Sequence, residues 1–226
     1  MSERFFITGT DTEVGKTVAS RALMQAAAGM GRKVAGYKPI ASGCTETAEG
    51  LRNSDALVLQ QSANIELSYA QVNPIALREP ASPHIAAKID GINIEFDHLS
   101  QGLRALEQHA DCVLVEGCGG WQVPVSDTQS LNEWVIAERM PVIMVVGIKL
   151  GCLNHAILTA QSIANDGLEL VGWVANRVNP CLMHYAEIIQ TLRCRMPAPQ
   201  LGEIPYISRP EKQQLGKYID LTPLLG

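Results

Sequence analysis

Short apolar runs alternate along the chain with amphipathic segments, and this alternation predicts the fold. The runs expected to form buried strands are residues 5–7, 33–38, 111–116, 142–147, 170–175 and 200–204. The segments with helical spacing of apolar positions are residues 18–28, 54–60, 98–108, 131–138, 153–165 and 183–192. Strands that are apolar on both faces are typical of a parallel sheet covered by helices on both sides. The pattern predicts a single three-layer α/β domain over residues 1–226, with a mostly parallel central sheet.

Three segments show neither a strand-like apolar run nor the apolar spacing of a helix. Residues 42–53 are polar and rich in Gly, Thr and Glu, which predicts a loop. Residues 68–97 are interrupted by prolines and predict a loop with short helical pieces. The residues after 204 predict a polar tail.

Composition and charge narrow the possible functions. The chain has 226 residues, of which 46% are hydrophobic, and a formal net charge of −5. Because it has no basic run, we expect no binding to nucleic acid or to an anionic membrane surface. Its six cysteines form no Cys-x-x-Cys pair, no signal peptide is visible, and the longest apolar run, residues 141–148, is too short to cross a bilayer. These features predict a cytoplasmic protein with reduced thiols.

The most informative stretch lies between the first predicted strand and the first predicted helix. Residues 9–17 read Gly-Thr-Asp-Thr-Glu-Val-Gly-Lys-Thr, one residue longer between the glycines than the usual G-x-x-x-x-G-K-[ST] spacing. Main-chain N–H groups at the start of such a helix favour an anion. We therefore expect Lys16 to reach the terminal phosphates of a nucleotide and the Thr17 hydroxyl to ligate Mg²⁺.

Polar residues also stand at the carboxyl ends of other predicted strands. Ligands of an open parallel sheet bind beyond these ends, which should gather residues 9–17, Lys38, Glu116, Lys149 and Asn176 at one edge. Lys38 could neutralise charge on a transferred phosphoryl group and on an anionic acceptor, and a plain surface lysine is the alternative.

Two carboxylates are candidates for the metal beside Thr17. Glu116 ends an apolar strand, and Asp55 lies at a helix start, so both could hold Mg²⁺ directly or through water. The alternatives are an ordinary strand-end acid and an acid that favours the first turn of a helix.

The ends of the later strands suggest which ligands are bound. The carboxamide of Asn176 could pair with an adenine edge, and the aspartate of the guanine-specific Asn-Lys-x-Asp motif is absent, which favours ATP over GTP. Residues 151–154 open a helix whose N–H groups would suit a substrate carboxylate, with a plain helix cap as the alternative. Cys152 has no identifiable base, so no covalent nucleophile is expected.

Several segments, in order and over essentially the whole chain, resemble the dethiobiotin synthetase family. They are residues 8–17, 36–39, 51–56, 82–84, 115–120, 151–156 and 172–176. The first of them, with its longer glycine spacing, is specific for that family. The resemblance implies a homodimeric, Mg²⁺-dependent enzyme with a fold like that of P-loop NTPases. It would join CO₂ to 7,8-diaminononanoate and close a cyclic urea, hydrolysing ATP to ADP and phosphate.

The resemblance also implies roles for single residues. Lys16, Lys38 and Thr12 would act on carbamate and phosphate oxygens, and Thr17, Asp55 and Glu116 would hold Mg²⁺. The residues implied at the nucleotide are Glu13, Val14, Gly15, Lys16, Thr17, Val18, Asp55, Glu116, Gly117, Cys118, Gly119, Asn176, Arg177, Ile204, Pro205, Tyr206 and Glu211. The residues implied at the other substrate are Ser42, Gly151, Cys152, Leu153, Asn154 and Tyr185.

Two other functions stay open at this point. The chain could be an ATP-driven dimerisation switch, although such switches carry a lysine early in the loop where this chain has Asp11. It could also be a second-copy ligase with a shifted substrate. Ile188 stands where a family member has tyrosine, which leaves Tyr185 as the nearest substitute, and Cys118 replaces a smaller residue.

Overall fold

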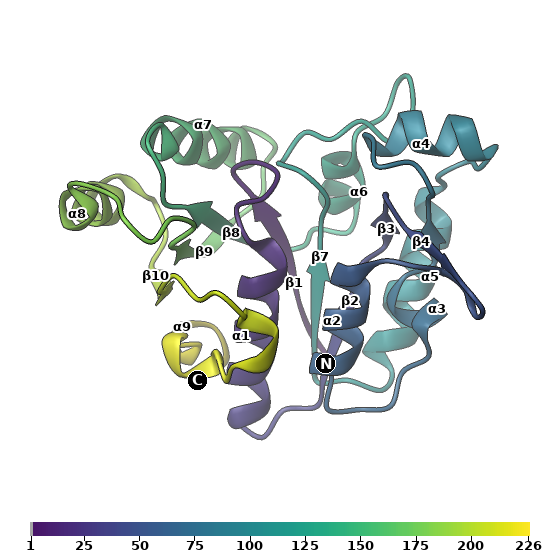
Figure 1. Cartoon of the computed structure of the whole chain (residues 1–226), viewed down its shortest axis with the longest axis horizontal. Coiled ribbons are helices and arrows are strands. Elements are labelled where there is room, and N and C mark those ends of the chain that lie inside the picture. Colours follow the sequence, from purple (N-terminus) through teal and green to yellow (C-terminus); the bar gives the residue numbers. More distant parts are fainter. Residues whose placement is uncertain (1) are drawn as a thin grey trace.

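The chain folds around a six-stranded parallel sheet between two layers of helices (Figure 1), in a computed structural model that describes residues 2–226. The strand order is β10-β9-β8-β1-β7-β2, and every neighbouring pair runs parallel. The strands are β1 (Glu3–Gly9), β2 (Val34–Tyr37), β7 (Cys112–Glu116), β8 (Val142–Gly147), β9 (Leu170–Asn176) and β10 (Gln200–Ile204). The predicted three-layer α/β fold with a mostly parallel sheet is confirmed.

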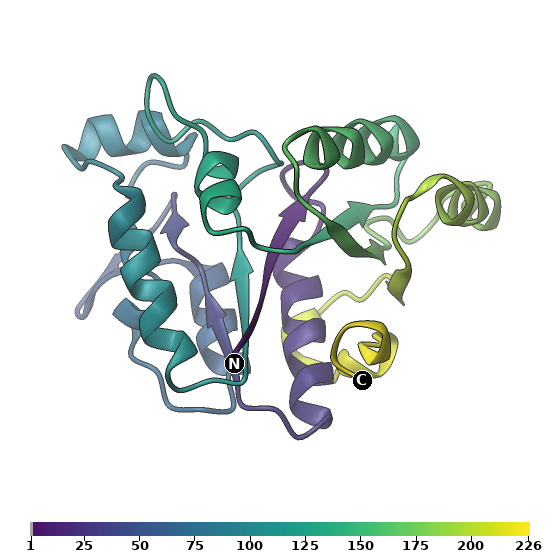
Figure 2. The same ribbon diagram turned by 180° about the vertical axis from the view of Figure 1, so that it is seen from behind.

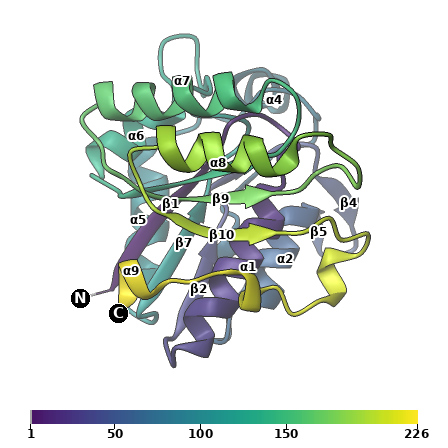
Figure 3. The ribbon, with the colours of Figure 1, turned by 90° about the vertical axis from the view of Figure 1, so that its left-hand side faces the viewer.

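Helices cover both faces of the sheet. Helices α1 and α2 lie on one face, and α5, α6, α7 and α8 lie on the other, as the view from behind and the side view show (Figures 2 and 3). The helices are α1 (Lys16–Gly29), α2 (Ser54–Ser62), α3 (Tyr69–Val72), α4 (Pro83–Asp90), α5 (Phe96–Glu107), α6 (Leu131–Ala137), α7 (Cys152–Asn165), α8 (Tyr185–Arg195) and α9 (Thr222–Leu225). No helix among residues 2–226 is long and apolar enough to cross a bilayer.

The core lies on both faces of the central strands. Every residue of β7 and β8 is buried, as expected for strands covered by helices on both sides. Helix α5 shows how the cover is made: its buried leucines, Leu99, Leu103 and Leu106, follow helical spacing, while its other face is largely exposed.

The predicted loop at residues 42–53 was wrong in part, because it contains an antiparallel hairpin of β4 (Thr45–Thr47) and β5 (Gly50–Arg52). Gly50 has φ +98°, a left-handed conformation that suits glycine at such a turn. The strands are short, and β4 is fully exposed, so they lack the alternating apolar positions that identify a strand in a sequence.

Two further segments contain structure that the pattern does not predict. In residues 68–97 the predicted short helical pieces are α3 and α4, but a strand β6 (Ile75–Ala76) also forms and pairs in parallel with β3 (Ile40–Ala41). The predicted polar tail instead folds back over α1 through η1 (Pro210–Lys212), η2 (Gly216–Tyr218) and α9. Its buried side chains are Leu215, Leu221 and Leu225. These contacts depend on partners far away in the sequence, which a local pattern does not reveal.

Candidate active site

The glycine-containing loop between β1 and α1 is braced from the ends of two neighbouring strands. Thr10 N donates to the carbonyl of Val145 at 3.1 Å, and Asn176 Nδ2 donates to the carbonyl of Val14 at 2.9 Å. Gly15 has φ +86°, and a Cβ atom there would collide with Asn176 Nδ2. Glycine is therefore required at this position both for backbone conformation and for space.

Lys16 crosses the mouth of this loop. Its Nζ donates to the carbonyl of Gly119 at 2.6 Å and to the carbonyl of Asp11 at 3.1 Å. Burial, together with the nearby Lys38 charge, lowers the pKa of Lys16 below its ordinary value. Its direct partners are main-chain carbonyls, so the ammonium contacts no carboxylate and its charge is available to an anion in the loop.

A buried ion pair lies next to the loop. Lys38 Nζ is 2.7 Å from Glu116 Oε1 and 3.5 Å from Asp55 Oδ2, and it donates to the carbonyl of Gly117 at 3.1 Å. The Thr17 hydroxyl donates to the same Glu116 oxygen at 3.0 Å. Burial disfavours the charged form of Lys38, but the Glu116 and Asp55 carboxylates more than offset this, and its pKa lies above the ordinary value. Lys38 is thus a buried ammonium rather than a surface lysine.

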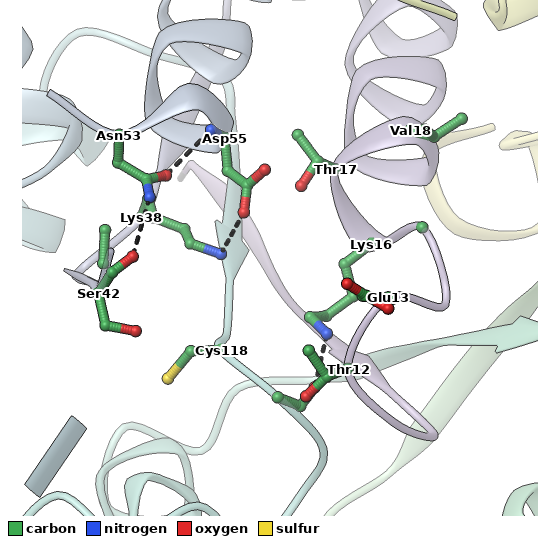
Figure 4. A pocket seen from close by; sticks show the side chains of 13 residues that line it. Thr12, Glu13, Lys16, Thr17, Val18, Lys38, Ser42, Asn53, Asp55 and Cys118 are labelled. Carbon is green, nitrogen blue, oxygen red and sulfur yellow. Dashed lines mark hydrogen bonds and ion pairs between the residues drawn. The ribbon is translucent and has the colours of Figure 1, made fainter. Parts of the chain in front are cut away.

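The carboxylate oxygens of Glu116 and Asp55 are suited to bind a magnesium ion. Glu116 is fully buried, and its Oε2 has no hydrogen-bond partner. An unpaired carboxylate oxygen is costly inside a protein unless a cation or a donor reaches it. Asp55 is 43% exposed and faces the same cavity (Figure 4). Over residues 2–226 no three His, Cys, Asp or Glu side chains form a metal cluster.

One cavity of about 430 Å³ joins these parts (Figure 4). Its lining residues are Thr12, Glu13, Gly15, Lys16, Thr17, Val18, Lys38, Ala41, Ser42, Asn53, Asp55, Cys118 and Gly119. The cavity brings together most of the residues that sequence analysis assigns to phosphate, metal and catalysis. It is large enough for a phosphate group and a small substrate.

The residues predicted for the base and ribose form a second group beyond the ends of β9 and β10. Asn176 and Ile204 are register partners on these strands, and Arg177 N donates to the carbonyl of Ile204 at 2.9 Å. The predicted residues that follow β10 are Pro205, Tyr206 and Glu211, with Tyr206 47% exposed and Glu211 in η1. One amide hydrogen of Asn176 is donated to the carbonyl of Val14 in the loop, so only the other amide hydrogen and the oxygen are available to contact an adenine.

The start of α7 is joined to the phosphate loop by an ion pair. Lys149 Nζ lies 3.1 Å from Asp11 Oδ2, and this hydrogen bond holds the pKa of Asp11 below its usual value. Gly151, with φ +90°, precedes Cys152, the first residue of α7. Burial raises the pKa of the Cys152 thiol and so disfavours the thiolate, which is the nucleophilic form. The sequence likewise predicts no covalent nucleophile at this position.

Tyr185 lies beside Arg177 within this chain. Its ring packs under the Arg177 guanidinium, 4.7 Å from the ring centroid, at the base-and-ribose end of the site. Within this chain the structure therefore groups Tyr185 with Arg177 rather than with residues 151–154. Its predicted contact with substrate stays a prediction.

Asn53, which is not among the residues predicted from the sequence, lines the cavity near Ser42 and Asp55 (Figure 4). Its side chain accepts hydrogen bonds from the main-chain N–H groups of Asp55 and Ala56 and so caps α2. An Asn directly before a helix start is a recognised capping signal, so this residue could have been found from the sequence.

Sequence comparisons show which known proteins the chain is similar to. A family model described as an AAA domain matches residues 3–214. The chain is 60% identical over 226 residues to an ATP-dependent dethiobiotin synthetase of Vibrio parahaemolyticus, covering 100% of this chain and 99% of the relative. It is 56% identical to such a synthetase of Yersinia pestis, with 100% of both chains covered.

Solved structures with the same fold are much more distant in sequence. They include the MinD cell division protein of Aquifex aeolicus, at 14% identity and a TM-score of 0.58 over 97% of this chain and 89% of that one. A ParA family ATPase of Chlorobium tepidum matches at 15% identity and a TM-score of 0.57 over 100% of both chains. These neighbours show a P-loop NTPase fold and nothing finer. The full-length identity to the curated relatives decides the family: this chain belongs to the ATP-dependent dethiobiotin synthetases.

Proposed function

We propose that this chain carboxylates 7,8-diaminononanoate with CO₂ and closes the product to dethiobiotin, using ATP and Mg²⁺ and releasing ADP and phosphate. The observation that carries the proposal is the convergence of Lys16, Thr17, Lys38 and Asp55 on one cavity, where the buried Glu116 bonds to both Thr17 and Lys38. Full-length identity to ATP-dependent dethiobiotin synthetases supports the same reaction.

The chemistry needs no covalent bond to the protein. One amine of the diamine adds to CO₂ and loses a proton, giving a carbamate, which is a poor electrophile. Attack of a carbamate oxygen on the γ-phosphorus of ATP expels ADP and forms a mixed carbamic–phosphoric anhydride. The second amine then attacks the carbonyl carbon, loses a proton and expels phosphate, which closes the cyclic urea. Positioning and charge neutralisation are sufficient for these steps.

The lysines are suited to neutralising the anions in these steps. Carbamate and γ-phosphate must approach to about 3–3.5 Å, where their repulsion in a partly desolvated cavity is strong. Lys16 would hold phosphate oxygens at the loop, and Lys38 would lie between phosphate and carbamate. The hydroxyls of Thr12 and Ser42, which line the same cavity, would contact phosphate and substrate.

Thr17, Asp55 and Glu116 would hold Mg²⁺. When bound, the ion would neutralise charge on the terminal phosphates. The unpartnered Glu116 Oε2 and the Thr17 hydroxyl beside it support this assignment. Arg177, Asn176 and the residues after β10 would contact the base and ribose.

We further propose a homodimer in which the start of α7 receives the substrate carboxylate. Leu150, next to that helix start, is 91% exposed, and Leu158 on α7 is 55% exposed, so this region offers apolar surface to a partner. Tyr185 would approach the carboxylate only through such a dimer. A cytoplasmic location is supported by the cysteines, all of which are free.

The test is ADP release measured with and without 7,8-diaminononanoate and bicarbonate. We expect ATP turnover to require both. Lys38→Gln should lower kcat by roughly 10²–10³-fold, as expected for loss of one preorganised charge, with a smaller effect on nucleotide affinity. Lys33→Gln, at an exposed lysine, is the matched control and should keep kcat.

Two outcomes would contradict the proposal. ATP turnover that ignores both substrates but rises with a protein partner would favour a dimerisation switch. A Lys38→Gln enzyme with normal kcat, or one that simply fails to bind ATP, would show that Lys38 has a different role.

A further inference from the structure

The main chain of Lys38 is held on both sides by the segment that follows α3. Lys38 N donates to the carbonyl of Val72 at 2.7 Å, and Asn73 Nδ2 donates to the carbonyl of Lys38 at 2.7 Å. Lys38 comes directly after β2, the edge strand of the main sheet, so no sheet neighbour on its outer side could make these bonds. Residues 72–73 supply them instead.

The contact continues as far as Ser42 and beyond it. Strand β3 pairs with β6, Leu77 N donates to the carbonyl of Ala41 at 2.8 Å, and Cys44 N donates to the carbonyl of Leu77 at 2.9 Å. Residues 38–44, which carry two of the predicted site residues, therefore lie along residues 72–77 for their whole length. This is part of the region whose sequence pattern predicts only loop and short helical pieces.

Three polar side chains connect this contact to α2. The Tyr69 hydroxyl donates to Asn73 Oδ1 at 2.9 Å and accepts from Asn53 N at 2.8 Å. Asn53 Nδ2 donates to the carbonyl of Ser42 at 3.2 Å, and Asn53 Oδ1 accepts from Asp55 N at 2.9 Å. Figure 4 shows Asn53 reaching both Ser42 and Asp55 beside the Lys38 ammonium.

We propose that Asn53, Tyr69 and Asn73 form a positioning network that fixes Lys38, Ser42 and Asp55 relative to one another. The inference rests on the proposed function, because it assumes that these residues act in catalysis. None of the three network residues is assigned to substrate or metal. Each acts through a residue that is.

The network needs an asparagine at positions 53 and 73 because each of these side chains both accepts and donates hydrogen bonds. Asn73 is 3% exposed, and its Nδ2 also donates to the carbonyl of Ile75 at 3.1 Å, so both amide hydrogens and the oxygen are used. Asn53 is 7% exposed; its Nδ2 donates to the carbonyl of Ser42, and its Oδ1 accepts from the N–H groups of Asp55 and Ala56. An Asp or Leu side chain could not make the same set of bonds. The Arg52 guanidinium lies 4.3 Å from the centroid of the Tyr69 ring and helps to keep that ring in place.

Small displacements of Lys38 should matter for rate more than for nucleotide affinity. A misplacement of about 1 Å at a reacting centre can cost about 10²-fold in rate. ATP affinity depends mainly on residues 9–17, which the network does not contact directly. The signature of the network is therefore a fall in kcat with little change in KM for ATP.

Steady-state kinetics of Tyr69→Phe, Asn73→Ala and Lys38→Gln test the proposal. Tyr69→Phe removes only the hydroxyl and should lower kcat about 10-fold, while Asn73→Ala should lower it about 10²-fold. KM for ATP should stay within about twofold in both. The matched control is Tyr37→Phe, which removes a buried hydroxyl that donates to the carbonyl of Leu99 at 2.9 Å, and which should keep kcat.

A double-variant cycle separates positioning from general damage to the fold. If Asn73 acts through Lys38, Asn73→Ala in the Lys38→Gln background should cost less than about 3-fold in kcat. If the kcat losses of Asn73→Ala and Lys38→Gln multiply in the double variant, the inference is overturned. A Tyr69→Phe enzyme with wild-type kcat would overturn it as well. If Lys38→Gln alone keeps wild-type kcat, the proposed role of Lys38 fails. A loss of kcat in Tyr69→Phe would then still support the network, acting through Ser42 and Asp55.

Discussion

Replacing Lys38 by methionine removes one half of the buried ion pair and should destabilise the ligand-free protein strongly. Lys38 is 4% exposed and Glu116 is fully buried, so Lys38→Met leaves a carboxylate inside the protein. One Glu116 oxygen already has no partner, and the other would keep only the Thr17 hydroxyl. Breaking a buried pair in this way costs about 3–5 kcal/mol. One kcal/mol shifts Tm by roughly 2–4 °C at this chain length, so Tm should fall by roughly 6–20 °C.

Urea unfolding and thermal melting without nucleotide or Mg²⁺ measure this loss. The double variant Lys38→Met with Glu116→Gln should recover much of it, because a neutral amide is buried at lower cost than a carboxylate. The control is Arg193→Met, which removes a 51% exposed arginine 3.6 Å from Glu203 and should change the free energy of unfolding by less than about 1 kcal/mol. A loss below about 1 kcal/mol for Lys38→Met, or losses that add in the double variant, would refute the reasoning.

Two further changes test the loop and a buried thiol. Gly15→Ala should weaken Mg·ADP binding at least about 10-fold in calorimetry, because the new methyl collides with Asn176, whereas Gly31→Ala, at φ +81° in open space, should keep the affinity. Burial raises the pKa of Cys112 from an ordinary 9.0 to about 12. Because the thiol therefore ionises in the unfolded chain before it ionises in the folded one, the free energy of unfolding is highest below about pH 9 and falls as pH rises toward 12. Cys112→Ala should therefore lose less stability than the wild type between pH 8 and pH 10, by about 1 kcal/mol in urea unfolding, and equal losses would contradict this.

The sequence predicts the parts of the site that depend on position along a strand. The glycine spacing before Lys16, and the places of Lys38 and Glu116 at strand ends, are sufficient to gather them at one edge of a parallel sheet. The same reasoning predicts the layers, because apolar runs and helical periodicity are local properties.

What the sequence does not predict are contacts between distant residues and main-chain atoms. The ion pair of Lys38 with Glu116 joins residues 78 positions apart, and Asn73 holds the Lys38 carbonyl from 35 positions away. A hydrogen bond to a carbonyl can be made by many donor side chains, so it leaves no characteristic residue at the acceptor position. The folded-back tail is missed for a similar reason, since its leucines are buried and η2 contacts α1 and β10, which are far away in the sequence.

The strand order has a consequence for folding during synthesis. Strand β1 is made first, yet it lies in the middle of the sheet and pairs only with β7 and β8, while β2 pairs only with β7. The first two strands of the sheet therefore have no partner until residues 112–116 have left the ribosome. At about 5–20 residues per second, the apolar β1 segment waits several seconds for its first neighbour. During that time the apolar residues of β1 lack the strands that pair with them in the folded sheet.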